Sequence, residues 1–283
     1  MTSVVVELAP TAGPGAGSGG RRVLKSILRS TLTFAVVTAL LVALWVGFLN
    51  LFDVSPYVGK RPTEVWRWVF DAEQGPARRA ELFAATRQSL GEALTGFVAG
   101  IALALVMAVA FTLSKPFERA VLPIALALRS VPIVAMIPLL AYVFGRGAMG
   151  SLVIISIIVF FPALVLVSNG LRSVRPESLE LLETYGANRI TQLVKVRLPS
   201  ALPSLLASAK VCAPLAILGA ILNGWLSTGK GLGNLMVEST ITAKYVQLWA
   251  AVVIVTVLSV LFAAVVSALE QAVYARYAPD RVP

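Results

Sequence analysis

The residues in this sequence that could best bind a ligand or take part in chemistry are a few charged side chains inside long apolar stretches. Glu92, Arg129 and Lys210 each interrupt such a stretch. Arg129 and Lys210 lie about ten residues from the nearer end, which is about 15 Å along a helix and close to the middle of a bilayer. Ionisable groups at that depth usually face a bundle interior, a cavity or a partner. Two interpretations remain open: a cationic lining for an anionic solute, or ion pairs for which Glu92 is an available partner.

Several kinds of catalytic site are excluded by composition. The sequence has no histidine, so histidine-dependent zinc sites, haem ligation and Ser/His/Asp or Cys/His catalysis are absent. Cys212 is the single cysteine, lies in an apolar run and is expected to be a small packing residue. Catalysis by carboxylates or lysines has no clustered acidic or Ser/Lys site to support it. We therefore expect neither a catalytic site nor a cofactor or metal in this chain.

The composition predicts a helical membrane protein. Of the 283 residues, 58% are hydrophobic and only 13% are charged, and the mean hydropathy is +0.85. A soluble domain is nearer half apolar and a quarter charged, and a transmembrane β-barrel would alternate apolar and polar residues instead of forming long apolar runs. These numbers argue against a soluble enzyme, a nucleic-acid-binding domain and a disordered protein.

The hydropathy pattern predicts an all-α membrane protein with six transmembrane helices. The apolar runs cover residues 30–52, 86–113, 119–144, 150–170, 201–223 and 247–272. Prolines interrupt the third and fifth runs and predict kinks there. The expected organisation is a flexible N-terminal tail (1–29), a first helix (30–52), an external loop (53–85), a five-helix core (86–272) and a C-terminal tail (273–283).

The positive charges predict the orientation of these helices. Thirteen of the 24 Lys and Arg fall in the N-terminal segment, the 114–119 turn, the 171–200 connection and the C-terminus, and nine fall in the opposite loops. Five of those nine lie in the 53–85 loop, and longer loops obey the positive-inside rule weakly. We expect both termini to be cytoplasmic, in a bacterial plasma (inner) membrane.

The 171–200 connection carries an unusual acidic helix. Glu177, Glu180 and Glu183 lie early in a predicted helix over 176–190, where the helix dipole favours anions. Gly186 suits a helix end or a close backbone approach. An acidic face on the cytoplasmic side suits docking of a basic partner better than binding of anionic lipid. The alternative is a solvated connector helix.

This connection resembles a known motif. Glu180-Leu181-Leu182, then Gly186, then Val196-Arg197-Leu198-Pro199 is similar to the E-A-A-x₃-G-x₉-I-x-L-P loop of ABC importer permeases, with both spacings matched and two alanines replaced by leucine. Other segments resemble the taurine, alkanesulfonate and nitrate-type group: Lys60-Arg61-Pro62-Thr63-Glu64-Val65-Trp66, Leu128-Arg129-Ser130-Val131-Pro132, Pro138-Leu139-Leu140 and Gly231-Leu232-Gly233. The resemblance covers about 59–272.

The resemblance implies the type I importer permease fold, with five core helices and a peripheral first helix. It implies an assembly of two permease subunits, two cytoplasmic ATPases and an external solute-binding protein. The 176–190 helix would dock in the ATPase through Glu177, Glu180 and Glu183, Gly186 would allow the turn, and Leu198 and Pro199 would begin the fifth span. The chain contains no G-x-x-x-x-G-K-[ST] motif, so another chain would bind ATP.

Two positions depart from the pattern of this group. Arg is common where this sequence has Glu92, and an acidic residue often precedes the Trp-Leu pair, where this sequence has Gly224. These departures weaken an assignment to sulfonate or nitrate. They leave open a neutral or cationic vitamin precursor, and a heterodimer with a different permease. A secondary transporter driven by an ion gradient and an intramembrane enzyme are the competing functions.

Overall fold

The computed structural model describes residues 36–277, with side chains described up to residue 274. The expected tail 1–29, the first residues of the expected first span and residues 278–283 lie outside the described part. The chain divides into two compact units, Met1–Pro62 and Thr63–Pro283. In the first unit, an apolar helix covers Val36–Leu51. Its described side chains are mostly exposed, as a lipid-facing helix would have them.

The core of the second unit is built from three long helices, α3 (Gly75–Leu113), α6 (Ala148–Arg172) and α9 (Leu198–Asn223). The buried face of α3 consists largely of small residues: Ser89, Ala93, Gly96, Gly100, Ala104 and Ala108. A Cβ on Gly96 would lie 2.4 Å from the Ile155 Cβ of α6, and one on Gly100 would lie 2.7 Å from the Val159 Cβ. The two backbones therefore approach as closely as small residues allow. The GxxxG formed by Gly96 and Gly100 therefore packs within the chain, against α6.

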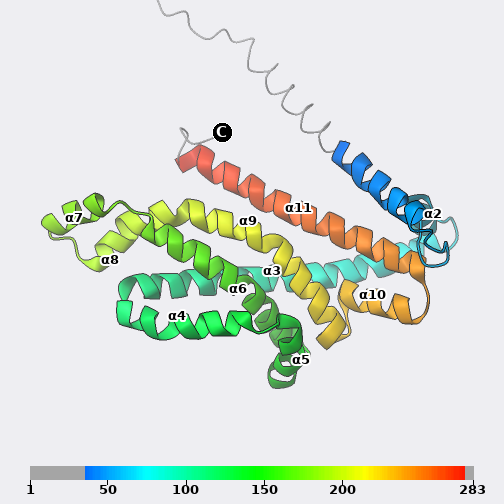
Figure 1. Ribbon diagram of the computed structural model, residues 1–283, viewed down its shortest axis with the longest axis horizontal. Coiled ribbons are helices and arrows are strands. Elements are labelled where there is room, and N and C mark those ends of the chain that lie inside the picture. Colours follow the sequence, from blue (N-terminus) through cyan, green and yellow to red (C-terminus); the bar gives the residue numbers. More distant parts are fainter. Residues whose placement is uncertain (1–35, 278–283) are drawn as a thin grey trace, which may run out of the picture. The chain divides into compact units, whose positions relative to one another are not determined.

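The third predicted span is broken into two helices. α4 (Lys115–Ser130) and α5 (Ile133–Phe144) meet at 107°. Pro132 lies at the break and cannot donate a backbone hydrogen bond, and Val131 before it is extended, as a residue preceding proline prefers. Figure 1 shows α4 running beside the core helices and α5 turning sharply from the end of α4, where it packs against α6.

Two wide turns of π-helix flank α9. The segment η1 (Leu193–Arg197) precedes it and η2 (Gly224–Thr228) follows it, and α8 (Arg189–Gln192) leads into η1. Together they form one apolar helical segment from Arg189 to Thr228. Pro199 has no N–H for the carbonyl four residues earlier, and the widened turn lies directly before α9.

Two further helices pack on this core, α10 (Gly231–Ile241) and α11 (Tyr245–Tyr277). The described part contains four helices long and apolar enough to cross a membrane, or five if the α4–α5 pair is one span. A multi-pass helical membrane protein is confirmed, and the predicted count of six is not.

Two predicted boundaries were wrong. The second span was expected to begin at 86, but α3 begins at Gly75, so the last part of the expected 53–85 loop is helical, and that loop also holds α2 (Pro62–Val69). The first turns of α3 are polar, but polar residues such as Arg, Glu and Gln have good helix propensity, so the helix extends through them. The predicted 176–190 helix ends at Thr184, because a left-handed turn at Gly186 separates α7 (Pro176–Thr184) from α8.

Candidate functional site

The acidic connection forms an exposed helical hairpin at one end of the second unit. No residue of α7 is buried. Glu177 and Glu180 are exposed, and so are the apolar side chains of Leu181 and Tyr185, at 58% and 81%. Residues four apart share a helix face, so Glu177 and Leu181 lie together, with Tyr185 just beyond the helix end. The exposed face is therefore apolar as well as acidic. Figure 1 shows α7 and α8 at the end where α3 gives way to α4.

Gly186 ends α7 through a left-handed cap. Its φ is +75°. The Ala187 N–H donates to the Leu182 carbonyl and the Gly186 N–H donates to the Glu183 carbonyl, both at 2.9 Å. This is the Schellman pattern, in which a glycine takes the left-handed position at low cost. A Cβ at Gly186 would meet nothing within 4 Å. Within this chain Gly186 is therefore required for its conformation and not for a close approach.

The third glutamate of the helix holds the hairpin together. The Gln192 Nε2 donates to the Glu183 Oε1 and to the Ala187 carbonyl, both at 3.3 Å. Gln192 is buried, and the side chain of Asn188 caps α8 by accepting the Thr191 N–H at 2.8 Å. Glu183 thus differs from Glu177 and Glu180 by having a partner inside the hairpin.

Two arginines join the hairpin to the helix bundle. The Arg197 Nη1 donates to the Leu171 carbonyl at the end of α6, at 3.1 Å. The Arg189 Nη1 donates to the Leu113 carbonyl at the end of α3, at 3.5 Å. The last carbonyls of a helix have no partner inside it, so both arginines also stabilise these helix ends. Leu198 and Pro199 begin α9 directly after Arg197, as expected.

Of the two open interpretations, the structure gives Lys210 an ion pair, but with a partner other than Glu92. The Lys210 Nζ of α9 lies 3.6 Å from the Glu270 Oε2 of α11, and not near Glu92. Glu270 lies on α11, which packs beside α9, whereas Glu92 contacts Asn223 at the end of α9. Arg129, in the last turn of α4, is exposed and has no ion pair or hydrogen bond to any other residue between 36 and 274.

Glu92 belongs instead to a polar network across three core helices. The Asn223 Nδ2 donates to the Glu92 Oε2 at 3.0 Å and to the Ser151 Oγ at 2.8 Å. The Gln88 Nε2 donates to the Glu92 Oε1 at 2.7 Å. Asn223 is fully buried and its Oδ1 has no hydrogen-bond partner in the described part. The network links α3, α6 and the end of α9, so its hydrogen bonds depend on the relative position of these three helices.

The Gly-Leu-Gly turn lies beside this network. Ser89 accepts the Leu232 N–H at 2.9 Å. A Cβ on Gly233 would lie 2.0 Å from the Ile221 carbonyl oxygen, and one on Gly224 would lie 2.6 Å from that of Lys230. Gly224 therefore has no room for an acidic side chain. The two departures at positions 92 and 224 meet here, because Glu92 binds the residue that precedes Gly224.

The sequence of residues 96–278 matches the family described as "Binding-protein-dependent transport system inner membrane component". The chain belongs to this family. These are the permeases of binding-protein-dependent ABC importers, which are transport components and not catalytic subunits.

Relatives and solved structures agree with this family. A "Probable ABC transporter permease protein" of Haemophilus influenzae is 29% identical over 174 residues, which is 62% of this chain and 71% of that protein. The formylaminopyrimidine transport permease protein ThiX of Halalkalibacterium halodurans is 32% identical over 138 residues, covering 47% of this chain and 55% of ThiX. Other relatives are named for sulfonates, riboflavin, taurine and nitrate.

The fold is shared with a bacterial ABC transporter involved in import of the acidic polysaccharide alginate. The TM-score is 0.61 at 15% identity, and the match covers 89% of this chain and 99% of that chain.

Sequence reasoning missed several residues of this permease. Tyr185 and Leu181 form the exposed apolar part of the hairpin, and Arg197 lies inside the matched motif but joins α9 to α6. The pair of leucines where the motif has alanines was the available indication of an apolar face. Asn223 and Glu270 gave no indication, because a single polar residue near the end of an apolar run is also common at a helix terminus.

Proposed function

We propose that this chain is the permease subunit of an ATP-driven importer of a small solute. It pairs with a second permease, identical or not, with two cytoplasmic ATPases that hydrolyse ATP, and with an external protein that delivers the solute. The α7–α8 hairpin docks in a groove of the ATPase. Closure of the ATPases moves it as a rigid unit, and the bundle alternates between two access states.

The observation that carries this proposal is the construction of the hairpin. It exposes Leu181 and Tyr185 beside Glu177 and Glu180, with no residue of α7 buried against the bundle. Contiguous exposed apolar side chains that are rimmed by polar residues mark an interaction site. Arg189 and Arg197 join the hairpin to the ends of α3 and α6. A displacement of the hairpin therefore reaches both helices.

The test is uptake by the complete transporter in proteoliposomes, with the external protein and ATP supplied on their proper sides. Leu181→Asp and Glu180→Lys should each abolish ATP-dependent uptake and co-purification of the ATPase. Glu73→Gln, which changes an exposed carboxylate in the loop before α3, should leave both intact. ATP-independent uptake by this chain alone would favour an ion-gradient-driven transporter and contradict the proposal.

Two classes of solute fit the charges of the bundle. A sulfonate, nitrate or similar organic anion fits the exposed Arg129. A neutral or cationic vitamin precursor fits the other charges better, since Glu270 neutralises Lys210 and Glu92 places a carboxylate where Arg is common. We propose the second class on these grounds. Mass spectrometry of the ligand bound to the co-purified external protein discriminates the two, and a sulfonate or nitrate there would contradict this choice.

A further inference from the structure

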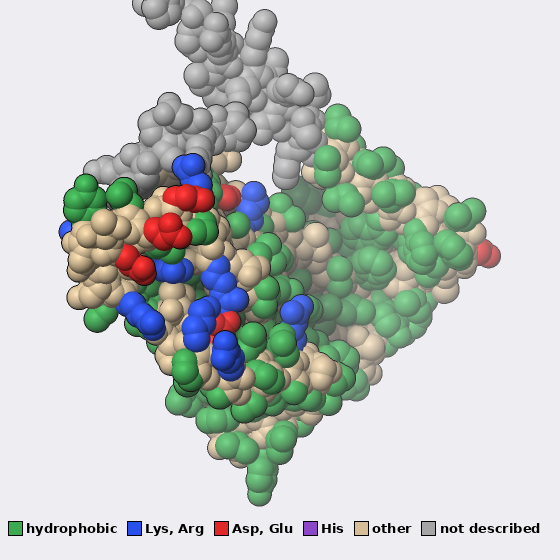
Figure 2. Space-filling view, turned by 60° about the vertical axis from the view of Figure 1, so that its left-hand side comes forward, with side chains coloured by type: hydrophobic (Ala, Val, Ile, Leu, Met, Phe, Trp, Pro, Cys, Tyr) green, Lys and Arg blue, Asp and Glu red, His purple; other side chains and the backbone are tan. Residues whose placement is uncertain are grey.

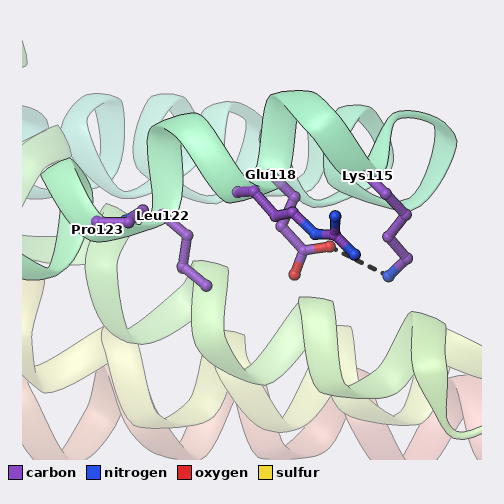
Figure 3. A pocket seen from close by; sticks show the side chains of 5 residues that line it. Lys115, Glu118, Leu122 and Pro123 are labelled. Carbon is purple, nitrogen blue, oxygen red and sulfur yellow. Dashed lines mark hydrogen bonds and ion pairs between the residues drawn. The ribbon is translucent and has the colours of Figure 1, made fainter.

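A groove with a basic end and an apolar wall runs along α4. Its volume is about 500 Å³, and it is lined by Lys115, Glu118, Arg119, Leu122 and Pro123. Figure 3 shows Lys115 and Glu118 pointing toward each other at one end, with Leu122 and Pro123 further along the same helix. The groove lies outside the α7–α8 hairpin and outside the polar network of Glu92.

The basic end carries an excess of positive charge. The buried Glu118 binds the Lys115 Nζ at 3.1 Å and also pairs with the Arg172 guanidinium of α6. The positive charges of Arg172, Arg197 and Arg119 all act on Lys115. Two cations contact this carboxylate, and the charges of two more act on Lys115 beside it. Arg119 is exposed and has no ion pair among residues 36–274, so its charge is available to a ligand.

The sequence of α4 changes from basic to apolar along one face. Lys115, Arg119 and Leu122 follow at spacings of four and three, which keeps them on the same side of a helix, and Leu126 continues that side. Leu126 is exposed at 51%. From Arg119 to Leu126 the helix rises about 10 Å, a large part of one bilayer leaflet.

A ligand matching this groove has an anionic head and an apolar tail. A phosphate diester meets Lys115 and Arg119 at the end of the bundle, and acyl chains cover Leu122 and Leu126. We infer that the groove along α4 binds an anionic phospholipid, with its phosphate held by Lys115 and Arg119. Basic pockets between membrane helices bind such headgroups through these two interactions. The lipid stabilises the α4–α6 contact, because its phosphate adds a negative charge beside the Glu118–Arg172 pair.

Native mass spectrometry of the delipidated full chain, titrated with phosphatidylglycerol or phosphatidylcholine, tests this inference. The wild-type protein should bind phosphatidylglycerol more tightly. Lys115→Gln with Arg119→Gln should lower that preference about 30-fold, or about 5-fold for each cation. Arg146→Gln with Lys244→Gln removes the same charge from exposed turns elsewhere and should leave the preference unchanged. An equal preference in both double variants would overturn the inference.

Two further arms separate this lipid from other occupants. Glycerol 3-phosphate, a head without chains, should not displace phosphatidylglycerol at a 100-fold excess, and displacement would show a simple anion site instead. Arg119→Gln alone tests the site with the least structural change, because Glu118 keeps both of its partners. It should weaken phosphatidylglycerol binding and leave co-purification of the ATPase intact. Loss of the ATPase with unchanged lipid binding would assign the groove to that partner and overturn the inference.

Discussion

At the scale of single residues, Gly186 shows why a matched motif and a structural role must be separated. Its left-handed φ and the two Schellman hydrogen bonds explain the glycine without any partner. A residue that disfavours the left-handed region therefore damages the hairpin, whether or not an ATPase comes close. A variant that keeps the conformation but adds a side chain is needed to distinguish the two reasons.

Gly186→Asn is that variant, because Asn tolerates the left-handed region whereas Val does not. We expect Gly186→Val to weaken the cap by about 1–2 kcal/mol and to abolish protection of the Ala187 amide in hydrogen exchange. Gly186→Asn should keep that protection. If ATP-dependent uptake is nevertheless lost with Asn, the space beside Gly186 is filled by the ATPase. If uptake is retained, the glycine serves the turn alone.

Glu118 is the second residue whose replacement has a defined outcome. It is buried and bridges Lys115 of α4 to Arg172 of α6. Glu118→Ala leaves two cations facing each other without a carboxylate. Because both cations are about half exposed, we expect a loss of only about 1–2 kcal/mol in the free energy of unfolding, visible as a lower melting temperature in detergent. Glu73→Ala, an exposed carboxylate, should not shift the melting temperature, and a shift as large as that of Glu118→Ala would contradict this account.

At the scale of elements, the small-residue face of α3 determines how closely the core helices pack. Gly96 and Gly100 meet Ile155 and Val159 of α6, and the Ser156 Oγ donates to the Gly96 carbonyl at 3.3 Å. Figure 1 shows these helices crossing at the centre of the second unit. The packing depends on the absence of a side chain at two positions and not on any polar interaction of high energy.

Gly96→Ala should therefore be destabilising by about 1–3 kcal/mol, since overpacking forces the backbones apart. Gly91→Ala, on the same helix, adds the same methyl group where nothing lies within 4 Å. It should be neutral or slightly stabilising, because Ala restricts the unfolded chain. Thermal unfolding of both variants in detergent measures the difference. Equal melting temperatures for the two variants would show that α3 and α6 are further apart than described.

The elements also show where sequence reasoning succeeds and fails. The apolar runs predicted the fourth, fifth and sixth spans closely, because each is a nearly uninterrupted stretch of apolar residues in α6, α9 and α11. The break between α4 and α5 has a local cause at Pro132, but its angle of 107° depends on packing. The early start of α3 at Gly75 was missed, because a hydropathy profile ends a span where polar residues begin although the helix continues.

At the scale of the whole molecule, charged side chains interact with partners that are far away in the sequence. Lys210 pairs with Glu270, sixty residues away, and Glu92 with Asn223. The sequence showed that carboxylates were available to pair with the cations. It did not show which carboxylate lies on a helix that packs beside the helix of a given cation. The acidic hairpin was predictable because its residues are contiguous. Figure 2 shows acidic and basic side chains gathered together at that end of the protein.

The Lys210–Glu270 pair predicts a charge-swap experiment. Lys210→Glu should lower ATP-dependent uptake and the melting temperature, because two carboxylates then face each other between α9 and α11. Lys210→Glu with Glu270→Lys restores an ion pair and should recover most of both. A double variant that regains stability but not uptake would indicate that Lys210 contacts the solute. That result would favour an anionic solute over the vitamin-precursor class.

The contact between α3 and α6 has a further consequence for ligand measurements. Ile155, Val159 and Ala163 of α6 are fully buried, so a solute has no passage between these helices. In the proposed assembly, the route then follows an outer face of the subunit and is closed by the facing permease. A single purified chain then presents half of a binding surface to detergent. Affinities measured on it will underestimate those of the paired assembly, however well the chain is folded.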